Sequence, residues 1–430
     1  MKLKHFIITC FTCCGLFAAE EPLSLSIFKE ISAAQKGNVL YSPNIMETSL
    51  AYVAQCTIGK TKDELRNLRY SAPDKYSAVN PLSALALFVA DDVKLKGKKL
   101  PIIRVPFATK PAAAVKKINA WFSRKTRHLI PNAIGADDVS ADTRLFFASA
   151  LCMVEGWVET FDKTATVPNY PFTRSDGTVV KVPMMVAEDS TDHHYAEGED
   201  WQAVRLVIMS NKKASYNKCA GSFIAIRPRG DVREFAAKLT PELLAHIYKE
   251  LARPIMYKEG NQYHIRYTDV KLPRFSLPPA EVDLTPHLKK LGVRTLFTPQ
   301  ADFSVLTDEQ GLYLAHLKQK NAIEVHEDGF SAVSVMWGGA LGAYSGMVEH
   351  HFSITLDKPF IFIIGAAHPQ VAPYFMGICE NPAVAPAATV YADDIPPGTC
   401  EHRLASEFYP VVASLPEHGA YAPLFEVTEP

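Results

Sequence analysis

Few residues in this chain have the types and spacing needed for catalysis, phosphate binding or metal binding. The sequence contains no phosphate-binding loop, no HExxH motif, no GxSxG elbow and no pair of CxxC motifs. The only adjacent histidine pairs are His193–His194 and His350–His351. Neighbouring side chains on an extended segment point to opposite faces, so one such pair seldom chelates a metal ion. We therefore expect solvated surface histidines, no metal, no cofactor and no enzymatic activity.

The most unusual segment is an uncharged one. No Asp, Glu, Lys or Arg occurs over 329–348, directly after Glu327-Asp328. Such a segment could cross a membrane, form part of the core, or be a loop that finds a place elsewhere in the fold. Its glycines Gly338, Gly342 and Gly346 have the spacing of packed membrane helices. However, its serines and glycines lower the hydropathy and acidic residues flank it, so a membrane span is the less favoured interpretation.

As a β-strand, the same segment would have one face of small residues, because side chains alternate between the two faces of a strand. Apart from Phe330 and Met336, every residue of that face over 330–342 is small. An exposed, uncharged, strand-forming segment promotes aggregation unless the fold has a place for it. The pattern favours a loop that can slide into a narrow slot between existing strands.

The two ends of the chain differ from the rest. Residues 1–19 combine a basic start, an apolar run and Ala18-Ala19, which predicts a signal peptide and a secreted, extracellular or periplasmic protein. A lipoprotein anchor is less favoured, because the residues before Cys14 fit a lipidation motif poorly. Residues 383–430 are rich in proline and lack periodicity. We interpret them as a C-terminal extension, either extended or docked as an irregular segment.

The charge balance argues against one class of ligand. The 45 Lys and Arg residues nearly balance the 46 Asp and Glu residues, giving a formal net charge of −1. Nucleic-acid binding needs a basic surplus or patch, and the one cluster that stands out is 94–99. We predict no nucleic-acid partner and no basic helix for a heparin-like polyanion. After the signal peptide, Cys219 and Cys400 could pair, but nothing in the sequence requires a disulfide.

The elements that would carry these residues show no regular strand–helix alternation. Ser42 and Pro43 are typical of a helix start and predict a helix to Gln55, and further helices are expected over 112–122 and 231–251. The apolar run 145–154 predicts a central strand. Because most other strands are expected in the second half, the pattern favours the α+β class.

Short motifs along the chain resemble, in the same order, those of the serpin family. They are Asn38–Pro43, Ile118–Phe122, Gly156-Trp157, Asp176–Met185, Leu272–Phe275, Ala301–Ser304, Ile323–Gly329, Asp357–Phe360 and Met376–Pro382. The match covers 22–382. The resemblance implies one serpin-like domain over 20–382, with three β-sheets, eight or nine helices and an exposed reactive loop. Because 59–112 is short for the family, we expect one or two helices there to be missing or trimmed.

The resemblance also implies a mechanism and a set of site residues. In inhibitory members, a serine or cysteine protease cleaves the reactive loop, which then inserts as a new strand and distorts the bound enzyme. The target protease would be the partner of a monomeric protein. The implied hinge of the loop is Glu327, Asp328, Gly329, Phe330, Ser331 and Ala332. The implied breach and shutter, where the sheet opens, contain Trp157, Ser42, Ser149 and Gln319.

Two counts bracket the bond that the protease would cut. The family's usual spacing from Glu327 gives Ala343–Tyr344, whereas counting back from Lys358-Pro359-Phe360 gives 345–348. No Lys, Arg or Asp lies within 329–348. The residue types of this segment therefore favour elastase-, subtilisin- or chymotrypsin-like proteases over trypsin-like ones as the target.

Departures from the family pattern keep a second function open. The first hinge residue is normally small but here is Phe330, the next is Ser331 instead of Glu, and Ile45 stands at a shutter position that is usually Ser. A bulky residue on the inserting face costs on the order of 1–3 kcal/mol. Slower insertion would let the protease finish cleavage. The alternatives are thus a trapping inhibitor and a non-inhibitory binding protein or decoy substrate.

Overall fold

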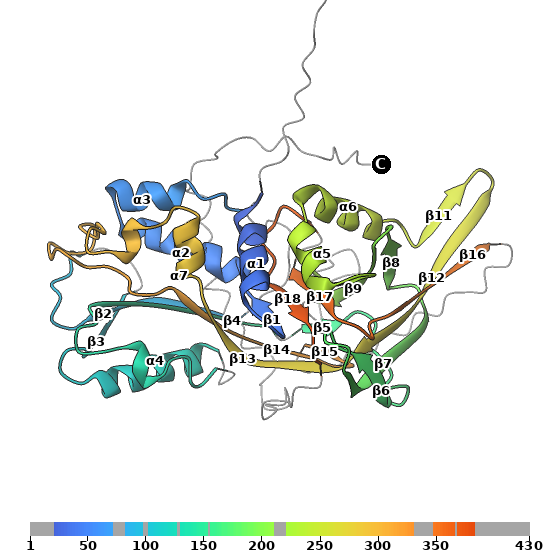
Figure 1. Cartoon of the computed structure of the whole chain (residues 1–430), viewed down its shortest axis with the longest axis horizontal. Helices are drawn as coiled ribbons and strands as arrows, with labels where there is room; N and C mark the ends of the chain where they lie inside the picture. Colours follow the sequence, from blue (N-terminus) through green and yellow to red (C-terminus); the bar gives the residue numbers. More distant parts are fainter. Residues whose placement is uncertain are drawn as a thin grey trace, which may run out of the picture.

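Three β-sheets and seven α-helices make up the part of the chain that the computed structural model describes (Figure 1). The described residues are 21–71, 82–97, 102–126, 130–153, 155–209, 221–330, 347–365 and 368–382. The α+β class and the three sheets are thereby confirmed. The predicted signal peptide, the C-terminal extension and the loop positions Ser331, Ala332, Ala343 and Tyr344 lie outside the described residues, as do Cys219 and Cys400.

One five-stranded sheet, here called the β4/β14 sheet, has the order β13–β14–β4–β2–β3. Its strands are β13 (Phe275–Asp283), β14 (Lys318–Val325), β4 (Leu145–Cys152), β2 (Leu82–Ala90) and β3 (Ile102–Val105). The predicted central strand is confirmed, since β4 lies in the middle. β4 and β14 run parallel, whereas each pairs antiparallel with its other neighbour, β2 and β13. The sheet therefore contains two parallel pairs, namely β2–β3 and the β4–β14 seam, and the seam joins strands that are distant in sequence.

The other two sheets surround the end of that seam. The eight-stranded sheet contains β1 (Val39–Tyr41), β18 (Phe375–Cys379), β17 (Phe360–Gly365), β10 (Gly221–Pro228), β9 (Trp201–Met209), β5 (Glu155–Trp157), β15 (Gly329–Phe330) and β8 (His194–Glu197). A second five-stranded sheet contains β11 (Met256–Glu259), β12 (Gln262–Pro273), β7 (Val179–Ser190), β6 (Val167–Thr173) and β16 (Val348–Thr355). β16 resumes the described chain after the uncharged segment and pairs parallel with β12.

The helices are slightly fewer than predicted. They are α1 (Leu23–Ala34), α2 (Pro43–Cys56), α3 (Gly59–Arg66), α4 (Pro111–Lys125), α5 (Val232–Lys238), α6 (Pro241–Leu251) and α7 (Thr285–Lys290), with two short 3₁₀ turns, η1 (Ala136–Asp138) and η2 (Thr295–Phe297). The expectation of eight or nine helices is too high for the described residues, where only strands occur between α3 and α4. No helix among these residues is long and apolar enough to span a bilayer.

Local sequence explains where two of these helices begin. The start of α2 is confirmed, because the Ser42 hydroxyl accepts a hydrogen bond from Ile45 N at 3.4 Å and Pro43 opens the helix. The single helix predicted over 231–251 is wrong. Leu239 is extended, Thr240 caps a new helix by accepting from Leu243 N at 3.2 Å, and the proline that follows takes the first helical position.

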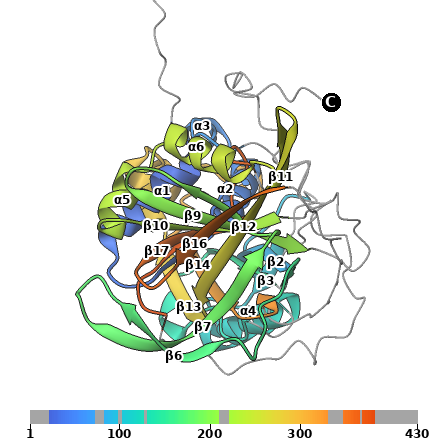
Figure 2. The same cartoon turned by 90° about the vertical axis from the view of Figure 1, so that its right-hand side faces the viewer.

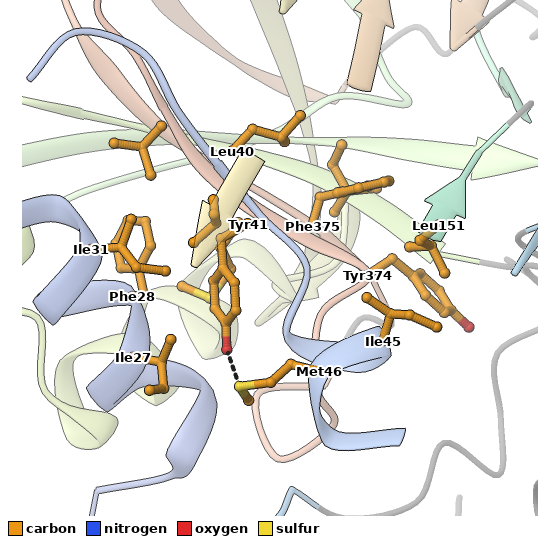
Figure 3. Packing of buried hydrophobic residues seen from close by; sticks show 14 of the residues in the cluster. Ile27, Phe28, Ile31, Leu40, Tyr41, Ile45, Met46, Leu151, Tyr374 and Phe375 are labelled. Carbon is orange, nitrogen blue, oxygen red and sulfur yellow. Dashed lines mark hydrogen bonds between the residues drawn. The ribbon is translucent and has the colours of Figure 1, made fainter. Parts of the chain in front are cut away.

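The helices enclose the β4/β14 sheet from both sides. Figures 1 and 2 show α4 on one face of the sheet and α1, α2 and α3 on the other. Figure 3 shows how side chains from α1 and α2 meet β1 in the core, where the Tyr41 hydroxyl donates to Met46 Sδ at 3.2 Å. This packing fixes the start of α2, and with it Ser42, directly beside β14.

Candidate functional site

β14 ends in a tight turn that reverses the chain. His326 N donates to Gly329 O at 3.0 Å, and Gly329 N donates to His326 O at 3.1 Å. Gly329 has φ of +134°, which side chains rarely adopt. A Cβ at this position would also overlap the carbonyl oxygen of Glu155 and lie 2.6 Å from Gly156 Cα. The turn therefore requires glycine at position 329.

After the turn, Gly329 and Phe330 form β15, which lies between the end of β14 and β5. On one side Gly329 bridges to His326, at the end of β14. On the other side β15 pairs antiparallel with β5, in the register Gly329↔Gly156 and Phe330↔Glu155. Because β5 follows β4 along the chain, β15 lies at the end of the β4–β14 seam, antiparallel to β5 on one side and bridged antiparallel to His326 on the other.

A buried ion pair holds the first residue of this turn. The Glu327 side chain is only 3% exposed, and its carboxylate accepts from Arg274 Nε at 3.1 Å, from Arg274 Nη2, and from Thr166 Oγ1 at 2.7 Å. Burial alone would raise the pKa of Glu327, but the hydrogen bonds from Arg274 and Thr166 outweigh it and the pKa lies below its usual value. Lys163 Nζ forms a more exposed pair with Asp328 at 2.6 Å.

Trp157, on β5, forms hydrogen bonds with the same turn. Its side chain is 1% exposed, and the indole Nε1 donates to His326 O at 2.9 Å. Trp157 N also donates to Asp328 O at 3.2 Å, and Phe161 N donates to Glu327 O at 3.0 Å. The turn is thus held at three successive carbonyl groups, so displacing it requires these three hydrogen bonds to break.

The predicted shutter residues meet halfway along the seam. Gln319 is the register partner of Ser149 on β4. Its amide accepts from Ser42 N at 3.2 Å and donates to Ser42 O at 2.9 Å. Gln319 therefore ties β14 to the start of α2. Asn321, fully buried on the same strand, donates to Gln319 Oε1 at 3.3 Å. Ile45 lies buried in the first turn of α2 (Figure 3).

Sequence reasoning missed four polar residues at this site. Arg274, Thr166 and Lys163 hold the Glu327–Asp328 turn, and Asn321 forms a hydrogen bond with Gln319. Arg274 belongs to one of the quoted motifs, but it reaches Glu327 only because β12, β13 and β14 bring their ends together in the fold. No local pattern in the sequence marks such a pair.

The histidine pairs do not both lie at the surface. The prediction that His193 is solvated is wrong, because burial against Phe161 leaves it 2% exposed and lowers its pKa to about 4. The half-buried His350 lies edge to edge with His264, with 3.0 Å between His264 Nδ1 and His350 Nε2. His351 stacks on Tyr267 instead, so the two neighbouring side chains diverge as expected.

We expect Gly329→Ala to destabilise the hinge turn. A positive φ and a Cβ that overlaps backbone atoms together cost about 1–3 kcal/mol, and the overlapped atoms belong to a strand that cannot move independently. Limited proteolysis should cut the variant near 326–330 faster than the unchanged protein. Gly311→Ala, also at positive φ (+78°) but with no atom near its Cβ, serves as the control for strain alone. Equal proteolysis of both variants would contradict the packing argument.

Known proteins resemble this chain over most of its length. A family model described as Serpin (serine protease inhibitor) matches residues 98–382. Plasminogen activator inhibitor 1 of Neovison vison is 29% identical over 389 residues, covering 83% of this chain and 91% of that protein. Leukocyte elastase inhibitor of Equus caballus is 25% identical over 399 residues, covering 85% and 99%. The crystal structure of Manduca sexta serine protease inhibitor (Serpin)-12 matches with a TM-score of 0.65 at 21% identity, covering 85% of this chain and 98% of that one.

Proposed function

Because this chain belongs to the serpin family, we propose that it is a secreted inhibitor that traps serine proteases by inserting its cleaved loop between β4 and β14. The chain would be the substrate that the protease attacks, and the chemical step would be performed by the protease. The observation that carries this proposal is the parallel β4–β14 seam with the loop already paired at its end through β15. Names of relatives such as leukocyte elastase inhibitor support a protease as the partner.

The seam is suited to accept a strand. Its register covers only Lys318↔Ala148 to Asn321↔Leu151, although β14 continues to Val325. A loop that follows the hinge turn would run antiparallel to both strands. One parallel pairing would thereby be replaced by two antiparallel ones, which are slightly more stable per residue. The inserted residues would also gain a full set of backbone hydrogen bonds, which provides the driving force for distorting an attached protease.

The rest of the proposal concerns parts of the chain outside the described residues. Residues 1–19 would direct secretion, 20–382 would form the inhibitory domain, and 383–430 would be an appended extension. The bond to be cut is Ala343–Tyr344, and its neighbours suit elastase-, subtilisin- or chymotrypsin-like enzymes. A cysteine protease is the alternative target class. Finding the inhibitory cut after a Lys or Arg outside 329–348 would contradict this assignment.

The deciding experiment incubates the mature chain with elastase-, chymotrypsin- and subtilisin-like proteases, followed by denaturing gels and mass spectrometry. We expect a covalent complex that survives detergent and a cut within 338–348. The cleaved protein should melt more than ~10 °C higher than the intact one, which corresponds to roughly 7–8 kcal/mol for a domain of this size. Cleavage with no covalent complex and no rise in melting temperature would instead support the alternative function, a decoy substrate or a non-inhibitory binding protein.

Two matched variants test insertion itself. In an inserted strand Ala332 would face the sheet interior and Val333 the opposite side, because the faces alternate. Ala332→Arg would bury an unpaired charge and should reduce the trapped fraction at least tenfold while cleavage continues. Val333→Arg adds the same charge to the other face and should change trapping less than twofold. Equal trapping by the two variants would argue against insertion as a strand.

A further inference from the structure

The hairpin formed by β11 and the start of β12 projects from the body of the molecule. Figure 1 shows it extending outward on the right, with β16 alongside. Met256 pairs with Ile265 and Glu259 with Gln262, around a turn where Gly260 has φ of +60°. In the described part of the chain, β12 is the only strand that pairs with β11. Loop insertion between β4 and β14 makes no use of this hairpin.

The strand register relates this hairpin to the bond that a protease would cut. β16 pairs parallel with β12 from His264↔Val348 onward, so the chain before Val348 leaves the sheet on the same side as the hairpin turn. The proposed function, on which this inference rests, places the cut at Ala343–Tyr344. Tyr344 precedes Val348 by four positions, which is at most about 14 Å of chain. The hairpin extends over a similar length, since Gly260 precedes His264 by four positions, or about 13 Å.

A folded protease is large compared with this distance. A domain of about 200 residues has a radius of gyration of roughly 16 Å, and a protein complex of ordinary size covers about 800 Å² on each partner. A protease bound at a bond within about 14 Å of Val348 therefore covers surface well beyond the loop itself. Because the residues that follow the cut lead back to β16, the hairpin faces the part of the protease that binds those residues.

One face of the hairpin, here called its outer face, exposes large apolar side chains. Met256 is 39% exposed and Tyr263 is 51% exposed. They share a face, because Tyr263 is two positions from Ile265, the register partner of Met256. Lys258 Nζ lies 5.5 Å from the centre of the Tyr263 ring. Lys258 and Glu259 near the turn have opposite charges. The outer face therefore offers an apolar contact of the residue types that are enriched where proteins bind one another.

The opposite, inner face holds the hairpin against its neighbours. Tyr257 stacks on His264 with 4.9 Å between the ring centres, and His264 Nδ1 lies 3.0 Å from His350 Nε2 on β16. Further along β12, Arg266 Nη2 donates to the Tyr195 carbonyl oxygen on β8 at 3.0 Å. The outer side chains are thus presented from a hairpin that is already fixed to β16 and β8. A contact made by such a surface loses less conformational entropy than one made by a loop that must first be ordered.

A second copy of the chain is the other protein that could cover this face. However, β11 has only four residues and ends in Lys258-Glu259, and short, charged edge strands resist pairing with another chain. The hairpin also offers far fewer residues than the about 20–30 on each side of a stable dimer. We propose that Met256 and Tyr263 form a second contact with the target serine protease, beside its active-site cleft on the side of the residues that follow the cut. This contact increases the rate of attack and leaves loop insertion unchanged.

The test measures the second-order rate constant for cleavage of the full mature chain by pancreatic elastase, chymotrypsin and subtilisin. With the protease that attacks the unchanged chain fastest, we expect Met256→Ala/Tyr263→Ala to lower this constant at least fivefold. The fraction of cleaved molecules that form a covalent complex should stay the same. Because the contact is apolar, the factor should be equal in 50 mM and 500 mM NaCl.

Two control variants separate this contact from general effects on the fold. Leu291→Ala/Tyr313→Ala removes side chains of similar exposure, 39% and 42%, and Figure 1 shows α7, which Leu291 follows, well away from the hairpin. It should change the rate less than twofold. Met256→Leu/Tyr263→Phe keeps the apolar surface and should also stay within twofold of the unchanged chain. Circular dichroism and melting of all three variants confirm that they are folded.

The possible failures can be told apart. If the chain is cleaved within 329–348 and the two double-alanine variants react equally fast, the hairpin contact is refuted and the proposed inhibitor stands. If none of the three proteases cleaves within 329–348, the proposed function fails and the role of the hairpin fails with it. An effect that disappears in 500 mM NaCl would contradict an apolar contact. A dimer of the unchanged chain in sedimentation that Met256→Ala/Tyr263→Ala dissociates would assign the outer face to a second copy instead.

Discussion

Replacing Arg274 with alanine is expected to lower the free energy of unfolding by about 2–3 kcal/mol at pH 7. The substitution leaves the carboxylate of Glu327, which is nearly inaccessible, without its cationic partner. Breaking a fully enclosed pair in this way costs about 3–5 kcal/mol. The Arg274 side chain is 43% exposed, so solvent already weakens the pair and the smaller value applies. Denaturant unfolding of the uncleaved protein measures the change.

The effect of Arg274→Ala should depend on pH in a defined direction. The folded protein holds the pKa of Glu327 below its usual value of 4.5, so the stabilisation is fully present above that value. It is lost as the pH falls through the lower, folded-state pKa. The difference between the variant and the unchanged protein should therefore shrink as the pH is lowered from 7 to 3. A difference that stays constant over this range would contradict a charged pair at the hinge.

A matched control separates burial from charge. Arg229 pairs with Glu197 at 2.9 Å, but both side chains are about half exposed. Arg229→Ala should cost less than about 1 kcal/mol, as is usual for surface pairs. Glu327→Gln tests the same site from the other side, because it removes the charge and leaves a group that still accepts from Thr166. It should destabilise the protein less than Arg274→Ala.

The sequence predicts the local elements of this fold better than the contacts between them. The start of α2 follows from Ser42 and Pro43, and the central position of β4 follows from its apolar run. The helix predicted over 231–251 fails because apolar spacing continues across Leu239, although Thr240 offers a cap signal. Apolar periodicity indicates which face of a helix is buried, but it does not indicate where one helix ends and the next begins.

The candidate site shows the same limit. The order of the motifs is enough to locate the Glu327 turn and Trp157, because each belongs to a contiguous stretch. The pairing of Glu327 with Arg274 and the burial of His193 depend on segments that are far apart in sequence. Tertiary structure supplies these contacts.

Phe330→Thr is expected to change the outcome of protease attack more than any other single substitution. The Phe330 backbone already pairs with Glu155 at the end of the seam, so this residue would be the next to enter. Because the inserting face is otherwise mostly small, a phenylalanine there overpacks the slot at a cost of about 1–3 kcal/mol. Removing that cost should accelerate insertion by roughly 5- to 150-fold relative to deacylation.

Faster insertion should change how the cleaved molecules divide between the trapped complex and the free cleaved product. With Phe330→Thr, fewer molecules of the serpin should be consumed for each protease molecule trapped, and denaturing gels should show more complex and less free cleaved product. Phe330→Leu keeps most of the bulk and should behave nearly like the unchanged protein. If the unchanged protein already traps one protease per molecule and Phe330→Thr brings no gain, then the seam accommodates the ring and Phe330 is not the obstacle. If cleavage of Phe330→Thr still yields no complex, the limitation lies instead at the shutter, where Gln319 ties β14 to Ser42.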